Sequence, residues 1–307
     1  MQQHIAVIGG GIGGLSLAWA LVRRGARVSL YEQGPIPNPI GSSFDEHRIT
    51  RHTYGGLSGY GALMPHAFRT YEALWRDLGE THYLPTNLLY VARRASDWYA
   101  ATSGELDAMG IAHRSVSSAE TEAFEAEGAG MLFASRIVTA LARWLDEAGV
   151  ALHPHSRVSD VDAEAGRFTV NGERRSADMG AIAAGAWLPA IYPAARPRLT
   201  PSRQVMLYLE PPAELAAAWA AAPVLVDQGL THGGYILPPR GGTRLKLGDH
   251  VFTRRGDGSD DRIATAEDVA VVTTAAGEIF AGFERYRLLE AKVCYYTVTD
   301  DERFVVE

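Results

Sequence analysis

The sequence predicts a fold of the α/β plus α+β class, in which a parallel-sheet domain is interleaved with a domain built on an antiparallel sheet. A strand, a glycine-rich turn, a helix and a second strand follow one another within residues 4–32. Alternating or aromatic runs between residues 205 and 297 are typical of antiparallel strands. An apolar strand at residues 179–184 is expected to return to the first sheet.

The first thirty-two residues are expected to form one Rossmann-like βαβ unit. Residues 4–8 are a short apolar run, and residues 12–24 place apolar side chains on one helical face. Gly25 ends this helix, and residues 27–31 form a strand that delivers Glu32 at its end. The crossover between the two parallel strands is right-handed by the usual rule.

Gly9, Gly11 and Gly14 match the dinucleotide-binding pattern G-x-G-x-x-G. Gly9 permits the sharp turn, Gly11 leaves room for a pyrophosphate, and Gly14 lets the helix pack close to the sheet. The free N–H groups of the helix N-terminus then face the phosphates. Glu32 can accept hydrogen bonds from ribose hydroxyls and would repel a 2′-phosphate, which disfavours NADP. The pattern leaves FAD and NAD open, and a glycine-rich turn without a ligand is the alternative.

The remaining elements are expected to be divided between two discontinuous domains. We predict a long irregular segment at 35–61, helices at 65–78 and 136–148, mixed short elements from 79 to about 130, and a tight turn at Asn171-Gly172. Strands are expected at 150–153, 158–162, 168–170, 205–209, 235–237, 245–247 and 293–297. Residues 1–83, 131–198 and 296–307 would form the FAD-binding domain, and residues 84–130 and 199–295 the substrate-binding domain.

Composition excludes several classes of protein. The 307 residues suffice for two domains, and the net charge of −7 argues against a nucleic-acid-binding surface. No apolar run approaches the roughly twenty residues of a membrane span, so we expect a cytoplasmic protein. Cys294 is the single cysteine, which excludes an intramolecular disulfide and a Cys-only metal site. We expect no metal.

Several short motifs in order resemble the sarcosine oxidase and N-methyltryptophan oxidase family of FAD-dependent amine oxidases. They are Gly41-Ser42-Ser43, Arg48-Ile49-Thr50-Arg51-His52-Thr53-Tyr54-Gly55, Gly185-Ala186-Trp187, Arg203-Gln204-Val205, Leu245-Lys246-Leu247-Gly248 with His250, and Cys294-Tyr295-Tyr296-Thr297 followed by Asp301-Glu302. The resemblance implies FAD as the cofactor, with Ser43 and Val158 among its ligands. It also implies a monomer that acts on a small-molecule amine and O₂.

The resemblance implies a role for Cys294 and for two arginines. Cys294 stands where the family forms a thioether to the 8α-methyl group of the flavin, and a buried packing cysteine is the alternative. Arg51 corresponds to the ligand of the substrate carboxylate, and Arg48 to a residue near the flavin ring. Surface ion pairs are the alternative for both arginines.

Lys246 has two opposed interpretations. Leu245 and Leu247 point to one face of their strand, so the pattern alone places the ammonium group of Lys246 in solvent. The resemblance instead turns it toward the flavin, where its charge would stabilise the superoxide formed as O₂ takes an electron.

The resemblance places Tyr235, His250 and Tyr296 in the substrate pocket, where they would orient the amine and tune its protonation. Taken singly, each of the three is a common core or surface residue. Tyr295 is bulkier than the family pattern and is expected to alter the pocket.

The implied reaction removes a hydride equivalent from the carbon next to a secondary or N-methylated amine. The products are an imine, which water hydrolyses, and hydrogen peroxide. A cyclic imino acid oxidase or dehydrogenase acting on a pipecolate- or proline-like ring is the first alternative. A second is a catalytically silent flavin-binding protein or a truncated fragment, because members of the family continue beyond the position of Glu307 with a segment that returns to the flavin.

Overall fold

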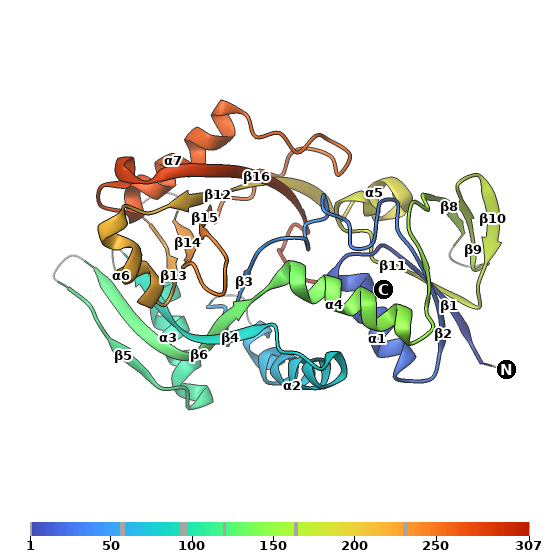
Figure 1. Cartoon of the computed structure of the whole chain (residues 1–307), viewed down its shortest axis with the longest axis horizontal. Coiled ribbons are helices and arrows are strands. Elements are labelled where there is room, and N and C mark those ends of the chain that lie inside the picture. The colour runs from blue at the N-terminus through green and yellow to red at the C-terminus, as the bar shows by residue number, and fades with distance from the viewer. Residues whose placement is uncertain are drawn as a thin grey trace.

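A computed structural model describes residues 2–55, 59–92, 97–118, 121–162, 165–229 and 233–306. Two large sheets stand side by side in this part of the chain, with helices on their outer faces (Figure 1). A four-stranded sheet lies near the N-terminus, and a nine-stranded sheet forms the other half. Within the described ranges, no helix has both the length and the apolar character of a membrane span.

The four-stranded sheet contains the predicted βαβ unit. Its central strand β1 (His4–Ile8) lies between β2 (Arg27–Tyr31) and β11 (Met179–Ile182), and β7 (Ala151–His153) lies beyond β2. Every pairing in this sheet is parallel. The predicted return of the chain at residues 179–184 is therefore confirmed. Because the strands are parallel, their carboxyl ends meet at one edge, where ligands bind in such sheets.

Helices α1 (Ile12–Val22) and α4 (Ala134–Glu147) pack against each other and against one face of the parallel sheet. Leu15 of α1 and Leu141 of α4 are fully buried in the core that they share. The helix predicted at residues 136–148 is confirmed within two residues. Burial of the apolar side chains of α1 and α4 holds α1 against the sheet, and the glycine turn lies at the start of α1.

The other face of the parallel sheet is covered by a small antiparallel sheet. This sheet consists of β8 (Val158–Asp162), β9 (Arg167–Val170) and β10 (Glu173–Ser176). Val158 packs with Tyr31 in a core cluster that joins the two sheets. The predicted turn at Asn171-Gly172 connects β9 and β10, and both of its residues have positive φ.

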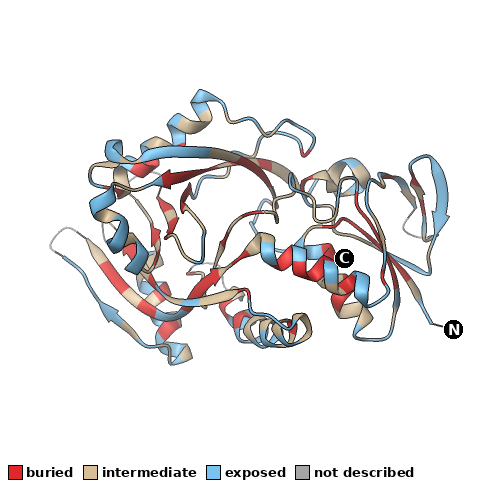
Figure 2. Cartoon of the chain, in the orientation of Figure 1, coloured by how far each residue is buried: buried red, intermediate tan, exposed pale blue. Residues whose placement is uncertain are grey.

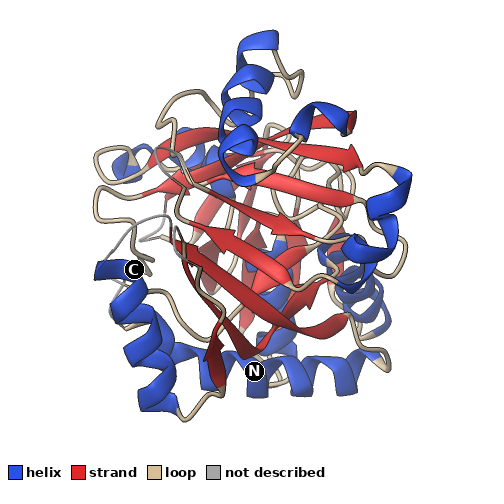
Figure 3. Ribbon diagram, turned by 90° about the vertical axis from the view of Figure 1, so that its left-hand side faces the viewer, coloured by secondary structure: helices blue, strands red, loops and turns tan. Residues whose placement is uncertain are grey.

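The nine-stranded sheet is mainly antiparallel. Its order is β16-β12-β15-β14-β13-β4-β6-β3, with β5 also paired to β6, and β13 and β4 run parallel. The strands are β3 (Arg48–Thr50), β4 (Tyr83–Ala92), β5 (His113–Ser115), β6 (Glu122–Leu132), β12 (Thr200–Glu210), β13 (Val224–Asp227), β14 (Gly234–Leu237), β15 (Leu245–Asp249) and β16 (Arg287–Val298). Figure 3 views the molecule from the end at which this sheet lies, with its strands in the centre and helices on the outside.

Helix α7 (Ala266–Ile279) packs on β12 and β15, and α3 (Asp97–Met109) packs beside β4. Figure 2 shows that buried residues run along the strands of both large sheets and along α4, while the outer helices keep exposed faces. The short helices are α5 (Leu188–Ile191), α6 (Ala216–Ala221), η1 (Gly185–Trp187), η2 (Pro193–Ala195), η3 (Ala213–Leu215) and η4 (Phe283–Arg285).

One predicted helix boundary and one predicted region are wrong. Helix α2 (Tyr60–Leu78) begins five residues before the predicted start, and Pro65 lies inside it. Proline favours the first turn because it has no N–H to donate, but here it occupies the second turn. The region expected to hold short elements contains the long paired strands β4 and β6. Proline, glycine and glutamate in these strands obscure their alternation.

The segment between β2 and β3 joins the two large sheets. Ser42 donates its hydroxyl to Tyr295 O, and Lys292 donates to Phe44 O at 2.6 Å, so β16 is bonded to this segment at two points. β3 itself pairs with β6 in the nine-stranded sheet although the predicted cofactor domain includes it. The division into domains stays a prediction.

Candidate active site

The turn after β1 has the backbone that a pyrophosphate site requires. Gly9 has a φ of +113°, and its N–H donates to Tyr31 O at 2.8 Å. A Cβ at Gly14 would overlap the carbonyl oxygen of Gly9, so only glycine lets α1 approach β1 this closely. A Cβ at Gly11, the N-cap of α1, would come within 3.2 Å of Ser43 Oγ. Gly9 and Gly11 therefore lie in one tight turn, and Gly14 packs the first turn of α1 closely against it.

Glu32 lies directly beside this turn and is only 8% exposed. One carboxylate oxygen accepts the Gly10 N–H at 2.7 Å, and the other accepts the Gly34 N–H at 3.0 Å and Asn38 Nδ2 at 2.9 Å. A carboxylate offers about four lone-pair positions, so these three bonds leave one for a ribose hydroxyl. Asn38 was not predicted, because nothing in its local pattern points to Glu32.

A cavity of about 630 Å³ opens in front of the turn. Predicted cofactor ligands that line it are Gly9, Gly11, Glu32, Ser43 and Val158. Its size is within the usual range for cofactor sites. Glycine backbone, a helix N-terminus and an acidic side chain at the second strand fit the ADP half of FAD. Gly14 lies behind the turn and acts through helix packing instead.

Lys246 forms a buried ion pair with Asp45. Its ammonium group donates to Asp45 Oδ2 and, at 3.0 Å, to the carbonyl oxygen of His47. The exposed fractions of the two side chains are 0% and 1%. The prediction from strand alternation that Lys246 faces solvent is wrong, because the segment around Asp45 covers the face of β15 opposite α7.

Arg48 and Tyr208 complete this buried network. Arg48 Nε lies 3.0 Å from Asp45 Oδ2, and the Tyr208 hydroxyl donates to Asp45 Oδ1. Burial alone would raise the pKa of Asp45, but the charges of Lys246 and Arg48 outweigh it and hold that pKa below its ordinary value. Burial and the charge of Arg48 lower the pKa of Lys246 to about 8. The carboxylate is therefore ionised at neutral pH.

Cys294 lies on β16 next to Arg48. The thiol is buried, and burial raises its pKa, although the charge of Arg48 acts in the opposite direction. A second cavity, of about 150 Å³, is lined by Asp45, Arg48 and Cys294 among others. A ligand in this cavity would contact the sulfur. Both interpretations of Cys294, attachment of flavin and simple packing, are compatible with this position.

Tyr235, His250 and Tyr296 converge from three segments of the chain, as the resemblance implied. The rings of Tyr235 and His250 have centroids 6.0 Å apart, and the hydroxyl groups of Tyr235 and Tyr296 lie close enough to interact electrostatically. Burial, and then the charge of Arg51, lower the pKa of His250 to about 4. Burial raises the pKa of both tyrosines. At neutral pH the cluster therefore presents a neutral imidazole and two neutral phenols.

Arg51 lies beside this cluster with an unused hydrogen-bond donor. Its Nη1 is buried and has no hydrogen-bond partner in the described part of the chain. The guanidinium carbon lies 5.0 Å from the centroid of the Tyr54 ring. A buried N–H without an acceptor is costly, and a ligand carboxylate would satisfy it.

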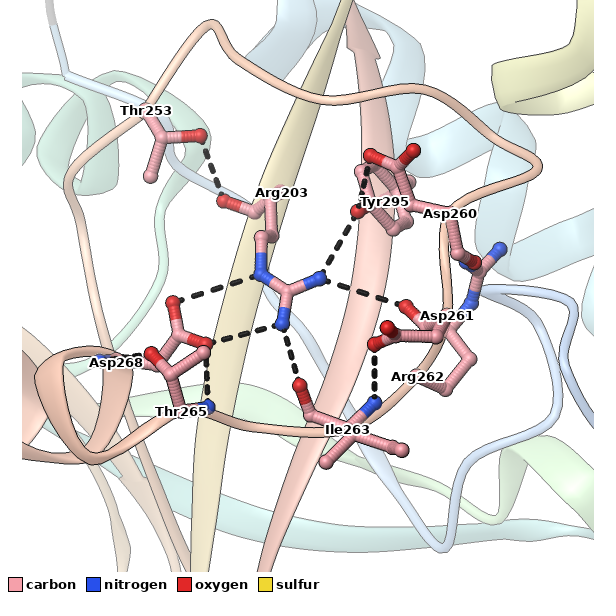
Figure 4. Close-up of polar contacts among 9 residues, drawn as sticks. All are labelled: Arg203, Thr253, Asp260, Asp261, Arg262, Ile263, Thr265, Asp268 and Tyr295. Atoms are coloured by element: carbon pink, nitrogen blue, oxygen red, sulfur yellow. Dashed lines mark hydrogen bonds and ion pairs between the residues drawn. The ribbon is translucent and has the colours of Figure 1, made fainter.

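Tyr295 faces away from this cluster. It packs with Val293, whereas Cys294 and Tyr296 share a cluster on the other face of β16. Its hydroxyl donates to Asp260 at 3.1 Å and accepts Arg203 Nη1 at 3.0 Å (Figure 4). The expectation that the bulk of Tyr295 alters the substrate pocket is wrong.

Arg203 holds the loop that precedes α7. Its guanidinium donates to Asp268 at 3.0 Å and to Ile263 O at 2.7 Å, as Figure 4 shows. Arg262, on the same loop, stacks over Tyr295 with its guanidinium carbon 4.5 Å from the ring centroid. The contacts of Arg203 therefore anchor this loop to β12 and β16.

A family model described as FAD dependent oxidoreductase matches residues 4–307. The chain belongs to this family. The predicted cofactor, FAD, and the oxidoreductase class are thereby confirmed. The matched region includes the glycine turn that is hydrogen-bonded to Glu32.

Relatives of known name match parts of the chain. A peroxisomal sarcosine oxidase of Mus musculus is 31% identical over 114 residues, which are 37% of this chain and 29% of that protein. A probable sarcosine oxidase of Arabidopsis thaliana is 24% identical over 204 residues, 60% of this chain and 49% of that protein. The chain thus covers about half or less of these curated relatives. They nevertheless confirm the resemblance inferred from the motifs.

Solved structures share the fold of this family member. NikD, described as an unusual amino acid oxidase, has a TM-score of 0.81 at 15% identity, over 98% of this chain and 84% of that chain. An L-proline dehydrogenase from P. horikoshii has a TM-score of 0.81 at 17% identity, over 100% of this chain and 85% of that chain. The predicted fold class is therefore confirmed.

Proposed function

We propose that this chain oxidises a secondary or N-methylated amino acid to an imine and reduces O₂ to hydrogen peroxide. The observation that carries the proposal is the unpartnered, buried Nη1 of Arg51 next to the Tyr235–His250–Tyr296 cluster. An amino acid substrate has a carboxylate that would bind Arg51 and an amine that would bind the Tyr235–His250–Tyr296 cluster.

The substrate-binding residues have separable roles. Arg51 binds the carboxylate, which fixes the amino acid relative to the cluster. His250, neutral because its pKa is about 4, accepts a hydrogen bond or proton from the amine. Tyr235 and Tyr296 stay protonated and orient the amine through their hydroxyl groups.

The cofactor-binding residues hold FAD across the two cavities. Gly9, Gly11 and Ser43 face the phosphates, and Glu32 binds the ribose. FAD, when bound, would accept a hydride equivalent from the substrate and pass two electrons to O₂. Lys246 provides fixed positive charge for the anion formed when O₂ gains an electron.

We also propose that Cys294 attaches the flavin through a thioether to its 8α-methyl group; the S–H bond and one methyl C–H bond would be broken, and the two electrons released would pass to O₂. Its support is the position of the sulfur in the wall of the cavity shared with Arg48. Mass spectrometry of the denatured holoprotein tests it. A Cys294 peptide that carries the mass of the flavin supports attachment, and an unshifted peptide excludes it.

A cyclic imino acid is the second candidate substrate, because a solved structure with the same fold is an L-proline dehydrogenase. Such a ring also contains a secondary amine and a carboxylate, so the same residues would bind it. The size of the pocket, rather than any single residue, would separate the two classes.

One assay distinguishes these candidates from a silent flavin-binding protein. Purified chain reconstituted with FAD is mixed with sarcosine, N-methyltryptophan, pipecolate or proline, and peroxide and flavin reduction are followed. Peroxide with the first two substrates supports the main proposal, and reduction by the last two alone supports the cyclic substrate. A protein that binds FAD but is reduced by none of them supports the silent alternative.

A further inference from the structure

We propose that Asp45 is a positioning residue that keeps Lys246 charged and holds its ammonium group at one place in the active site. The inference rests on the proposed function, since the purpose of the charged lysine is the reaction with O₂. It adds a residue that no sequence motif indicated.

Both oxygens of the Asp45 carboxylate are engaged. Oδ2 accepts a hydrogen bond from Lys246 Nζ and lies 3.0 Å from Arg48 Nε in an ion pair, and Oδ1 accepts the Tyr208 hydroxyl and, at 2.9 Å, the backbone N–H of Glu46. These three hydrogen bonds and the ion pair restrict rotation of the carboxylate. A lysine is long and flexible, so an acceptor fixed in this way determines where its ammonium group lies.

The other groups around Lys246 do not supply a negative charge. Arg48 of β3 is a cation, and the pKa values of Tyr208 of β12, Tyr235 of β14 and Cys294 of β16 are all raised by burial. The His47 ring has a pKa lowered by burial to about 3. Among these groups and Asp45, Asp45 is the anion at neutral pH.

Removal of the Asp45 charge should therefore lower the pKa of Lys246. Lys246 would remain fully buried next to Arg48, and both conditions favour the neutral amine. Its pKa would fall through the neutral range. The active site would then lose one positive charge although the lysine itself is still present.

The composition of the chain makes this measurable, because the sequence contains two lysines, Lys246 and Lys292. Protein labelled with ¹³C and ¹⁵N at lysine should give two side-chain NMR signals, and a Lys292→Arg variant assigns them. Lys292 bonds to Phe44 O and lies outside the ion pair, so it is an internal reference.

The first test titrates Lys246 in the full-length apoprotein. We expect Asp45→Asn to lower its pKa by about one unit or more and to leave Lys292 unchanged. Glu46→Gln is the matched control, because Glu46 is the adjacent carboxylate and pairs with Arg244 instead. A Lys246 titration that is the same in Asp45→Asn and the parent overturns the proposal.

The second test follows reoxidation of the reduced holoenzyme by O₂. Asp45→Asn should slow it about tenfold at pH about 8, with partial recovery at lower pH, while anaerobic reduction by substrate changes much less. In a Lys246→Met background the Asp45→Asn change should have little further effect. An equal loss at every pH, or additive losses in the double variant, contradicts the proposal.

Two controls separate this inference from failure of folding or of the proposed function. If Asp45→Asn does not fold, Asp45→Asn/Lys246→Met should fold, because the pair is then removed as a unit. A double variant that is also unfolded shows a purely structural role and overturns the proposal. If the holoprotein cannot be formed, the proposed function fails, whereas the apoprotein titration still tests the ion pair.

Discussion

The backbone N–H of Gly10 donates to Glu32 Oε2 at 2.7 Å, so the residue expected to bind the ribose also holds the turn expected to bind the phosphates. Glu32→Gln removes the negative charge that we expect both to bind the ribose and to hold the glycine turn. We expect the Kd for FAD to rise about tenfold or more, since hydrogen bonds to a charged group contribute about 1.5–3 kcal/mol. Fluorescence titration of apoprotein with FAD measures it. Glu147→Gln, on the exposed end of α4, is the control, and equal affinities for both variants would remove Glu32 from the site.

Two adjacent glycines allow a matched test of the turn. Gly14→Ala should destabilise the apoprotein by about 3 kcal/mol, because the new methyl group overlaps the Gly9 carbonyl. Gly13→Ala meets only the Ala183 side chain at 3.8 Å and should stabilise α1 by up to about 1 kcal/mol. Urea unfolding measures both. Similar stabilities for the two variants would show that α1 and β1 are not packed as described.

Lys246→Met should affect the two half-reactions differently. Loss of the buried ammonium group slows reoxidation of reduced flavin by O₂ about a hundredfold and leaves anaerobic reduction by substrate within severalfold of the parent. Stopped-flow absorbance separates the two steps. Arg143→Met, on the surface of α4, should change neither rate. A variant impaired only in flavin reduction would show that Lys246 acts on the substrate instead.

Arg51→Met should weaken binding of amino acid substrates. Because Nη1 has no other partner among the described residues, its loss raises KM by about ten- to a hundredfold. An N-methylated amine of the same shape without a carboxylate provides the control, since its kinetics should be the same in the parent and the variant. An equal loss for both compounds would mean that Arg51 supports the pocket rather than the carboxylate.

His47 should make the fold sensitive to acid. Its ring is fully buried, has no hydrogen-bond partner in the described segments, and has a pKa lowered from 6.5 to about 3 by burial and by Lys246. Because the unfolded chain binds the proton more readily, stability is complete above pH 6.5 and is lost as the pH falls toward 3. The loss approaches about 1.4 kcal/mol per pH unit. In urea unfolding across this range, His47→Leu should flatten the pH dependence, and an unchanged slope would contradict this account.

The parts of the fold that depend on local sequence were predictable. Gly9, Gly14 and Glu32 lie within one βαβ unit, and each is explained by turn geometry or strand position. The neighbours of Lys246 could not be predicted from local sequence, because its partner Asp45 is 201 positions away and lies in an irregular segment. Periodicity shows which face of a strand a side chain takes, but not what covers that face.

The resemblance extended the prediction to the residues that we propose bind the substrate amine. It grouped Tyr235, His250 and Tyr296, which composition and periodicity could not do, and in the structure both His250 and Tyr296 lie near Tyr235. It gave no indication of Asp45 or Tyr208. The carboxylate of Asp45 accepts hydrogen bonds from both Tyr208 and Lys246, and this arrangement is visible only in the structure. The orientation of Tyr295 also needed the structure, because the loop that it contacts precedes α7.

Binding of flavin by the purified chain is the most direct test of the central claim that the glycine turn and Glu32 form an FAD site. The full-length protein is incubated with excess FAD, separated from free cofactor by gel filtration, and its visible spectrum is recorded. We predict a yellow protein with the absorbance of about one flavin per chain. A colourless protein, with all the flavin in the small-molecule fractions, would contradict the account.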